Sequence, residues 1–197
     1  MYLISIYFDE HSSANLEKLI KRVATATGNS FMLDNQVPPH ITVAAVETKR
    51  EEELLDCVDR LVRGEGTCGA TDTIDEGNSV TTVKSQNVTS GAIHWVSVGA
   101  FFPQVLFVQP VLNEYLHNLS ATLSEELAQI EETILSPYYK PFGWLPHCTI
   151  AKQLTKEQMA EAHQILQQYF VPMEGRVTRI GVARTNPHRD IRVWELE

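Results

Sequence analysis

The chain has 197 residues, 43% of them hydrophobic, and a formal net charge of −9. This length supports one substantial core, so we expect a single domain over 1–197, built as one unit or as two intimate lobes. The negative charge argues against a protein that coats long nucleic acid, because affinity for a phosphate backbone comes largely from Lys and Arg. A short phosphate-bearing substrate remains compatible with it.

The sequence carries no pattern typical of secretion or membrane insertion. The apolar run over 1–10 has no basic leader and is too short for a signal peptide or a transmembrane helix, and we expect a strand there. The three cysteines, Cys57, Cys68 and Cys148, are odd in number and lack metal-ligand spacing. They fit a reducing compartment better than a disulfide framework, so we expect a cytoplasmic protein.

The strands are predicted from runs rich in Val, Ile and aromatic residues with partial alternation. They cover 2–8, 40–46, 93–99, 104–108, 147–152, 176–183 and 190–196. The stretch 64–91 is rich in Gly, Ser, Thr and Asp, and we expect a link there with at most one short strand near 80–83.

Helices are predicted between these strands from apolar residues at helical spacing. Ser12 or Ser13 can cap the first helix and Gly28 can end it, while Pro110 suits the first turn of the third. The second and fourth helices each begin with a capping box, Thr48-x-x-Glu51 and Thr155-x-x-Gln158. This order of elements predicts an α+β fold with helices on one side of largely antiparallel sheets.

One six-residue pattern occurs twice. Pro-His-x-Thr-apolar-Ala is found at 39–44 and again at 146–151. In each copy the pattern precedes a predicted capped helix at the same spacing. The chain is therefore expected to contain two related halves, each with a strand, a short turn and a helix.

The duplicated pattern predicts a phosphate site. Residues two apart on a strand point to the same face, so His40 should project with Thr42 and Ala44, and His147 with Thr149 and Ala151. If the halves pack about a pseudo-twofold axis, these faces meet across a cleft. One histidine could then accept a proton while the other donates one, and the threonine hydroxyls could hold phosphate oxygens. This scheme requires no metal or other cofactor.

The cysteine inside the second motif, Cys148, is expected to point the opposite way. It has no counterpart in the first motif, where Ile41 takes its place. Alternation puts it on the apolar face, so a small buried residue is favoured over a nucleophile.

These two motifs, His40-Ile41-Thr42 and His147-Cys148-Thr149, resemble those of the 2H phosphoesterase superfamily. That superfamily includes the bacterial RNA 2′,3′-cyclic phosphodiesterases, also called 2′-5′ RNA ligases. The resemblance implies an α+β fold of two pseudo-symmetric lobes, each an antiparallel β-sheet with outer helices, around a central groove. It also implies that the two histidines are the acid/base pair and the two threonines the phosphate ligands.

The resemblance further implies a substrate class. We expect a small nucleotide or an RNA end that carries a 2′,3′-cyclic phosphate or a 2′-5′ linkage. We expect a monomer without a membrane partner or stable binding to long nucleic acid. The stretch 64–91 matches no family pattern, so the identity of the substrate is not carried over.

Other residues have two interpretations. The aromatic residues before the second motif, Tyr138, Tyr139, Phe142 and Trp144, can stack a base or anchor a loop. Arg184 and His188, between the last two strands, can contact substrate or form a plain turn. The C-terminal arginines can form a phosphate-binding rim or a solvated face; they are Arg176, Arg179, Arg184, Arg189 and Arg192.

Alternative functions share these motifs. Acid/base chemistry on phosphate runs in both directions, so 2′-5′ RNA ligation or 2′-5′ phosphodiester cleavage is an alternative reaction. A nucleotide-binding module that has lost turnover is another, although both histidines and both threonines are retained. A zinc hydrolase is disfavoured because no His-x-His or His-Glu-x-x-His spacing occurs.

Overall fold

The computed structural model describes residues 1–65, 87–185 and 189–197. Cys68, His188 and the strand expected near 80–83 lie outside these ranges. The strands are β1 (Tyr2–Phe8), β2 (Ile41–Glu47), β3 (Gly91–Phe101), β4 (Val105–Pro110), β5 (Ile134–Leu135), β6 (Cys148–Ala151), β7 (Met173–Arg184) and β8 (Arg189–Glu195). The helices are α1 (Glu10–Thr27), α2 (Phe31–Asp34), α3 (Glu51–Arg63), α4 (Glu114–Leu127), α5 (Lys156–Tyr169) and the 3-10 helix η1 (Pro137–Tyr139).

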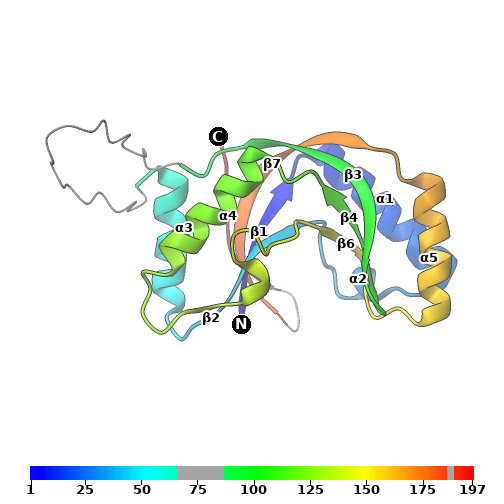
Figure 1. Cartoon of the computed structure of the whole chain (residues 1–197), viewed down its shortest axis with the longest axis horizontal. Helices are drawn as coiled ribbons and strands as arrows, with labels where there is room; N and C mark the ends of the chain where they lie inside the picture. The colour runs from blue at the N-terminus through cyan, green and yellow to red at the C-terminus, as the bar shows by residue number, and fades with distance from the viewer. Residues whose placement is uncertain (66–86, 186–188) are drawn as a thin grey trace, which may run out of the picture.

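The strands form one antiparallel sheet in the order β5-β2-β1-β7-β3-β4-β6, with β8 beside β7. Strand β7 joins two lobes, because Met173–Val177 pairs with β3 while Val177–Arg184 pairs with β1. The sheet bends into an arch, with α3 and α4 beyond one end and α1 and α5 beyond the other (Figure 1). The α+β fold of two lobes with outer helices is therefore confirmed, although the lobes share one continuous sheet.

The two halves of the sequence exchange helices. Helix α1 follows β1 but packs against α5 and β6 in the second lobe, and α4 follows β4 but packs against α3 and β2 in the first. Each helix buries one apolar stripe, as its spacing predicts. Neither lobe is complete without a helix from the other half, so the halves are expected to fold together.

Three helices, α1, α3 and α4, are capped differently from the prediction. Helix α3 begins at Glu51 with Arg50 before it, and the Thr48 hydroxyl accepts from the Arg50 backbone N–H at 3.0 Å, so the capping box predicted there is wrong. Pro110 ends β4, and Asn113 caps α4. The second predicted capping box, at Thr155, is confirmed in both of its hydrogen bonds.

Helix α1 is capped by Asp9 rather than by Ser12 or Ser13. Asp9 accepts from the Ser12 backbone N–H at 2.8 Å and from the Arg176 backbone N–H of β7 at 2.6 Å. The helix ends at Gly28, as predicted, in a left-handed conformation with φ of 69°. Burial alone would raise the pKa of the Asp9 carboxyl, but the hydrogen bonds from Ser12 and Arg176 outweigh it and hold the pKa below its usual value.

We expect Asp9→Ala to lower the free energy of unfolding by about 1–2 kcal/mol at pH 7, because the cap and the link to β7 are lost together. A lowered carboxyl pKa in the folded state contributes stability above the unfolded pKa and loses it as pH falls through the folded pKa. The difference from the parent chain should therefore shrink below about pH 4. Urea unfolding at pH 7 and pH 3 measures it, and an equal difference at both values would contradict the role of the charge.

Candidate active site

The two motif histidines make the same local contact. His40 Nδ1 lies 2.8 Å from the Pro38 carbonyl oxygen, and His147 Nδ1 lies 2.8 Å from the Leu145 carbonyl oxygen. A carbonyl can only accept, so each Nδ1 carries the proton and donates. In the neutral ring Nε2 is then the acceptor atom, which is the atom that a general base uses.

The two motif threonines lie on one face of the sheet. Thr42 is paired with Ser5 on β1, and Thr149 is paired with Phe107 on β4. Directly paired residues project to the same side of a sheet. When the pairing is followed from β1 through β7 and β3 to β4, both threonines and their partners, Ser5 and Phe107, lie on the same side. We call this side the motif face. His40 and His147 precede these threonines by two positions, so strand alternation directs both toward it.

A bulge follows each threonine and corrects the prediction for the two alanines. The register shifts after Thr42 and after Thr149, so Ala44 pairs with Ile4, and Ala151 pairs with Leu106. One extra residue reverses the alternation beyond it. Both alanines therefore lie on the face opposite the threonines, and the prediction that they project together with the threonines is wrong.

The two motifs are in contact near the residues at which they begin. Strands β2 and β6 contact each other, and the His40 backbone forms a hydrogen bond with the Cys148 thiol. The Trp144 indole N–H, from the loop before the second motif, donates to the Thr42 carbonyl at 3.0 Å. These contacts join the starts of both motif strands, although they lie in different lobes.

Cys148 lies on the face opposite Thr149, paired with Val108, and is fully buried. The prediction that it points into the core is confirmed. Burial raises the pKa of its thiol to about 12, against a small opposing effect of the hydrogen bond from the His40 backbone. A thiol with this pKa is not a nucleophile at neutral pH.

Polar groups surround the first motif. The Thr42 hydroxyl is 3.4 Å from the Ser5 hydroxyl and forms a further hydrogen bond with Tyr139. The Tyr7 ring centroid lies 6.4 Å from that of His40, and its hydroxyl donates to Asp190 at 2.7 Å. Burial, reinforced by Asp190, raises the Tyr7 pKa, so this phenol stays protonated.

Arg179 extends the same surroundings along β7. It is paired with Tyr7, and its guanidinium lies 5.6 Å from the centre of the Tyr7 ring. This pairing puts Arg179 on the motif face, two strands away from His40. It is the C-terminal arginine that best fits the predicted phosphate-binding rim.

Aromatic rings surround the second motif instead. The His147 ring lies 4.8 Å from the ring of Phe101 and 5.0 Å from that of Phe107, centroid to centroid. Burial lowers the pKa of His147, although the hydrogen bond to the Leu145 carbonyl raises it in part. His147 is therefore held in its neutral form at physiological pH more firmly than an exposed histidine.

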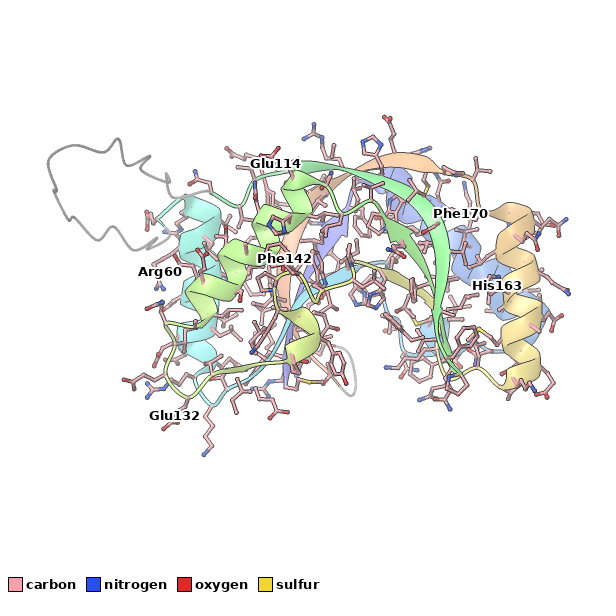
Figure 2. The ribbon with its side chains drawn as sticks, in the orientation of Figure 1. Arg60, Glu114, Glu132, Phe142, His163 and Phe170 are labelled. Carbon is pink, nitrogen blue, oxygen red and sulfur yellow. The ribbon has the colours of Figure 1, made fainter. Side chains whose placement is uncertain are left out.

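The other residues predicted as possible substrate contacts lie in different surroundings, and not all of them lie near the motifs. Tyr139 lies beside Thr42, whereas Trp144 is buried and anchors its loop to β2. Arg184 donates to Glu51 on α3 and is paired with Tyr2, on the face opposite Thr42. This position does not support a contact between Arg184 and substrate. Phe142 is exposed beside α4, where its ring is 5.1 Å from that of His117 (Figure 2).

Several residues on the motif face were missed from sequence; they are Ser5, Tyr7, Phe101 and Phe107. Ser5 had a signal, because it is the polar residue within the otherwise apolar and aromatic run of β1. The others had none, since their positions follow from strand pairing rather than from local pattern.

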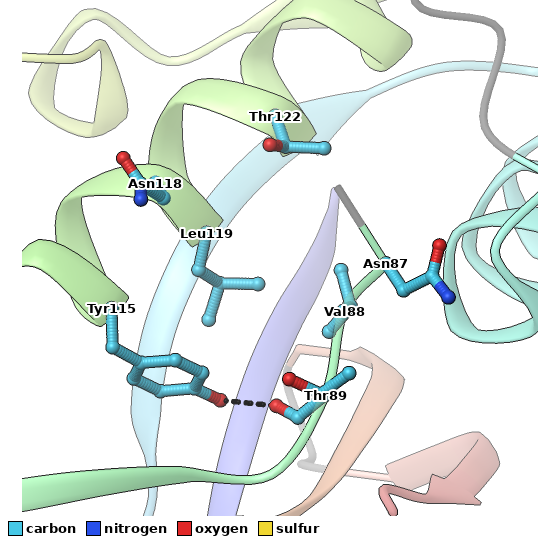
Figure 3. Close-up of a pocket in the computed structure, with 7 residues that line it drawn as sticks. All are labelled: Asn87, Val88, Thr89, Tyr115, Asn118, Leu119 and Thr122. Atoms are coloured by element: carbon cyan, nitrogen blue, oxygen red, sulfur yellow. Dashed lines mark hydrogen bonds between the residues drawn. The ribbon is translucent and has the colours of Figure 1, made fainter. Parts of the chain in front are cut away.

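Cavities are also found outside the motifs, among the described residues. One of about 340 Å³ is lined by α4 and residues 87–89, and within it the Tyr115 hydroxyl donates to the Thr89 carbonyl at 2.9 Å (Figure 3). The other, of about 640 Å³, lies between the start of α1 and β7, with Arg179 in its wall.

Among the described residues no group of three or more His, Cys, Asp and Glu side chains is placed to share a metal ion. Nor does the described part of the chain contain a helix with the length and apolar character of a membrane span.

Comparison with known proteins identifies the family. The model of the 2′-5′ RNA ligase superfamily matches residues 8–189. The chain belongs to this superfamily, whose members are 2H phosphoesterases. No curated protein sequence matches it.

Similar folds occur among solved structures. TT0787 of Thermus thermophilus is 14% identical with a TM-score of 0.54, and the match covers 99% of this chain and 97% of that one. LigT of E. coli in its apo form is 13% identical with a TM-score of 0.47, over 99% and 96% of the two chains. Usb1 of Kluyveromyces marxianus is 10% identical with a TM-score of 0.46, over 99% and 96%. The likeness to TT0787 agrees with the fold described above.

We expect Cys148→Ala to keep kcat/KM within about threefold of the parent chain while lowering the free energy of unfolding by about 1 kcal/mol, because only a small buried side chain is removed. The native thiol should also resist alkylation by iodoacetamide until the protein is unfolded. Kinetics, thermal unfolding and mass spectrometry of the alkylated chain measure these effects. Loss of turnover with an unchanged melting temperature would contradict the buried role.

Proposed function

We propose that this chain is a metal-independent phosphoesterase that hydrolyses 2′,3′-cyclic phosphates on small nucleotides or RNA ends. The observation that supports it most is the matched pair of Nδ1 contacts. Both histidines precede a strand, both donate from Nδ1 to a carbonyl, and both rings are directed toward the motif face with Nε2 as the second ring nitrogen. A substrate phosphate between them would meet one acceptor and, after protonation of the other ring, one donor.

The different surroundings support different roles for the two histidines. His147, with its lowered pKa, is the general base that takes a proton from the attacking water. His40 is then the general acid, which donates a proton from Nε2 to the ribose oxygen as its bond to phosphorus breaks. Water supplies the new oxygen on phosphorus, and one proton passes from water to His147 while another leaves His40 for the ribose hydroxyl. Exchange with solvent restores both rings.

The two threonines are proposed to hold the non-bridging phosphate oxygens. A neutral hydroxyl donor contributes through position and through stabilising charge in the transition state. Thr42 is buried and already bonded to Tyr139 and Ser5, so substrate must replace one of these contacts. Thr149 has Phe107 as its strand partner instead, and is more exposed.

The alternative reactions are separated by one substrate panel. It contains 2′,3′-cyclic nucleotides, RNA ending in a cyclic phosphate, 2′-5′ oligoadenylate, and a pair of RNA ends suited to ligation. Hydrolysis of the first two supports the proposal, whereas joining of ends or cleavage of 2′-5′ linkages alone would replace it with an alternative. Binding without turnover of any member would indicate a silent nucleotide-binding module.

We expect His40→Ala and His147→Ala each to lower kcat on a cyclic nucleotide by about 10²–10⁴, because each removes a positioned acid or base. Binding of the nucleotide product should change far less, and a chelator should leave the parent rate unchanged. His163→Ala is the matched control, since this exposed histidine lies on α5 at the outer end of the molecule (Figure 2). Metal-dependent turnover that survives loss of both motif histidines would contradict the mechanism.

The pH profile of kcat/KM should be bell-shaped, with its acid limb set by the base. A general base must be deprotonated, so activity falls as pH drops below its pKa. Because burial lowers the pKa of His147, the acid limb should lie below the ordinary histidine value of about 6.5. Phe101→Ala should expose the ring to water and move this limb upward. An acid limb above the ordinary value in the parent chain would exclude His147 as the base.

A further inference from the structure

The ring of Tyr7 lies beside the first motif histidine on the motif face. Strand β1 pairs Ile6 with Ile41, so the register brings Tyr7, the next residue of β1, opposite His40, the residue before β2. The two ring centroids are 6.4 Å apart with an interplanar angle of 47°. Aromatic rings at such a separation are in contact. Because Tyr7 is only 4% exposed, one side of the His40 ring is bounded by a buried side chain.

Tyr7 is itself held by the next two strands of the sheet. Its hydroxyl donates to Asp190 Oδ1 on β8 at 2.7 Å, a hydrogen bond that crosses β7. On β7 the ring lies against Gly181, where an added Cβ would come within 3.0 Å of Tyr7 Cε2. The guanidinium of Arg179 lies 5.6 Å from the ring centre. Strands β7 and β8 therefore fix the ring that β1 carries.

The hydrogen bond to Asp190 gives the Tyr7 ring a direction that packing alone does not give. A hydrogen bond to an ionised carboxylate is roughly twice as strong as one between neutral groups. His40 has a corresponding need, because its bond from Nδ1 to the Pro38 carbonyl fixes one ring atom but allows a broad range of ring tilts. The neighbouring Tyr7 ring limits that tilt, and with it the direction of Nε2.

We propose that Tyr7 and Asp190 are positioning residues for His40. Their hydrogen bond fixes the Tyr7 ring, and the ring aims His40 Nε2 at the leaving ribose oxygen. This inference rests on the proposed function, in which His40 is the general acid, and adds two residues to it. The second motif has a different arrangement, because His147 lies against two phenyl rings, which carry no hydroxyl.

The first test is steady-state hydrolysis of adenosine 2′,3′-cyclic monophosphate. Tyr7→Phe keeps the ring but not the hydroxyl, so it should lower kcat by about 10-fold and leave KM within about twofold, since only the aim of the acid is disturbed. Asp190→Ala should have the same effect. Asp190→Asn keeps an acceptor oxygen and should recover most of the loss. The double variant Tyr7→Phe/Asp190→Ala should lose no more than either single variant, because both remove one interaction.

Two control variants separate positioning from stability. Tyr2, also on β1, accepts a hydrogen bond from Arg184 through its hydroxyl at 3.3 Å on the opposite face of the sheet. Asp59 of α3 accepts from the Trp194 indole of β8 at 2.8 Å. Tyr2→Phe and Asp59→Asn thus remove comparable contacts of β1 and β8 away from His40. Both should keep kcat within about twofold of the parent chain, even where the melting temperature falls.

The second test requires no turnover. In ¹⁵N-labelled protein the imidazole resonances of His40 should be sharp in the parent chain and in Tyr2→Phe, but shifted or broadened in Tyr7→Phe and Asp190→Ala. Unchanged His40 resonances in Tyr7→Phe, additive losses in the double variant, or an equal loss in Tyr2→Phe would overturn the positioning role. A parent chain that hydrolyses no cyclic phosphate but shows the expected change in resonances would overturn the proposed reaction and leave the positioning of His40 standing.

Discussion

The candidate site depends on the contact between β2 and β6. These strands lie toward opposite ends of the sheet path, separated by β1, β7, β3 and β4, yet they meet where their motifs begin. The hydrogen bond between the His40 backbone and the Cys148 thiol, and that from Trp144 to the Thr42 carbonyl, join them. Because both contacts use backbone groups, they do not engage the side chains of His40 and Thr42 that are proposed to face a ligand.

The exchange of helices supports this contact. Each lobe is covered in part by a helix from the other half of the sequence, so the angle between the lobes is coupled to the core of both. Interiors packed at the density of proteins resist such rearrangement. A two-histidine mechanism needs this rigidity, because acid and base must both reach one phosphate within hydrogen-bonding distance.

The two motifs share a backbone but not a chemical environment. Both have a histidine donating to a carbonyl two residues earlier, a threonine and a bulge after it. The strand partner of the threonine differs, being Ser5 in one motif and Phe107 in the other. Tyr7 therefore lies beside the first histidine, while two phenyl rings lie against the second, whose burial lowers its pKa. Duplication accounts for the common geometry, whereas the neighbouring strands put different side chains beside each histidine.

The sequence by itself determined the duplicated motifs, the strands that carry them, the capped helix at Thr155 and the burial of Cys148. Each of these depends on local periodicity or on hydrogen bonds between residues close in the chain. Tertiary structure alone decided the reversal at Ala44 and Ala151, the exchange of α1 and α4 between lobes, and the placement of Tyr7, Arg179 and Phe107 beside the motifs. These features depend on pairing between strands that are far apart in the sequence. One extra residue in a strand reverses the face of every side chain beyond it, and no local sequence pattern indicates where such a pairing or bulge occurs.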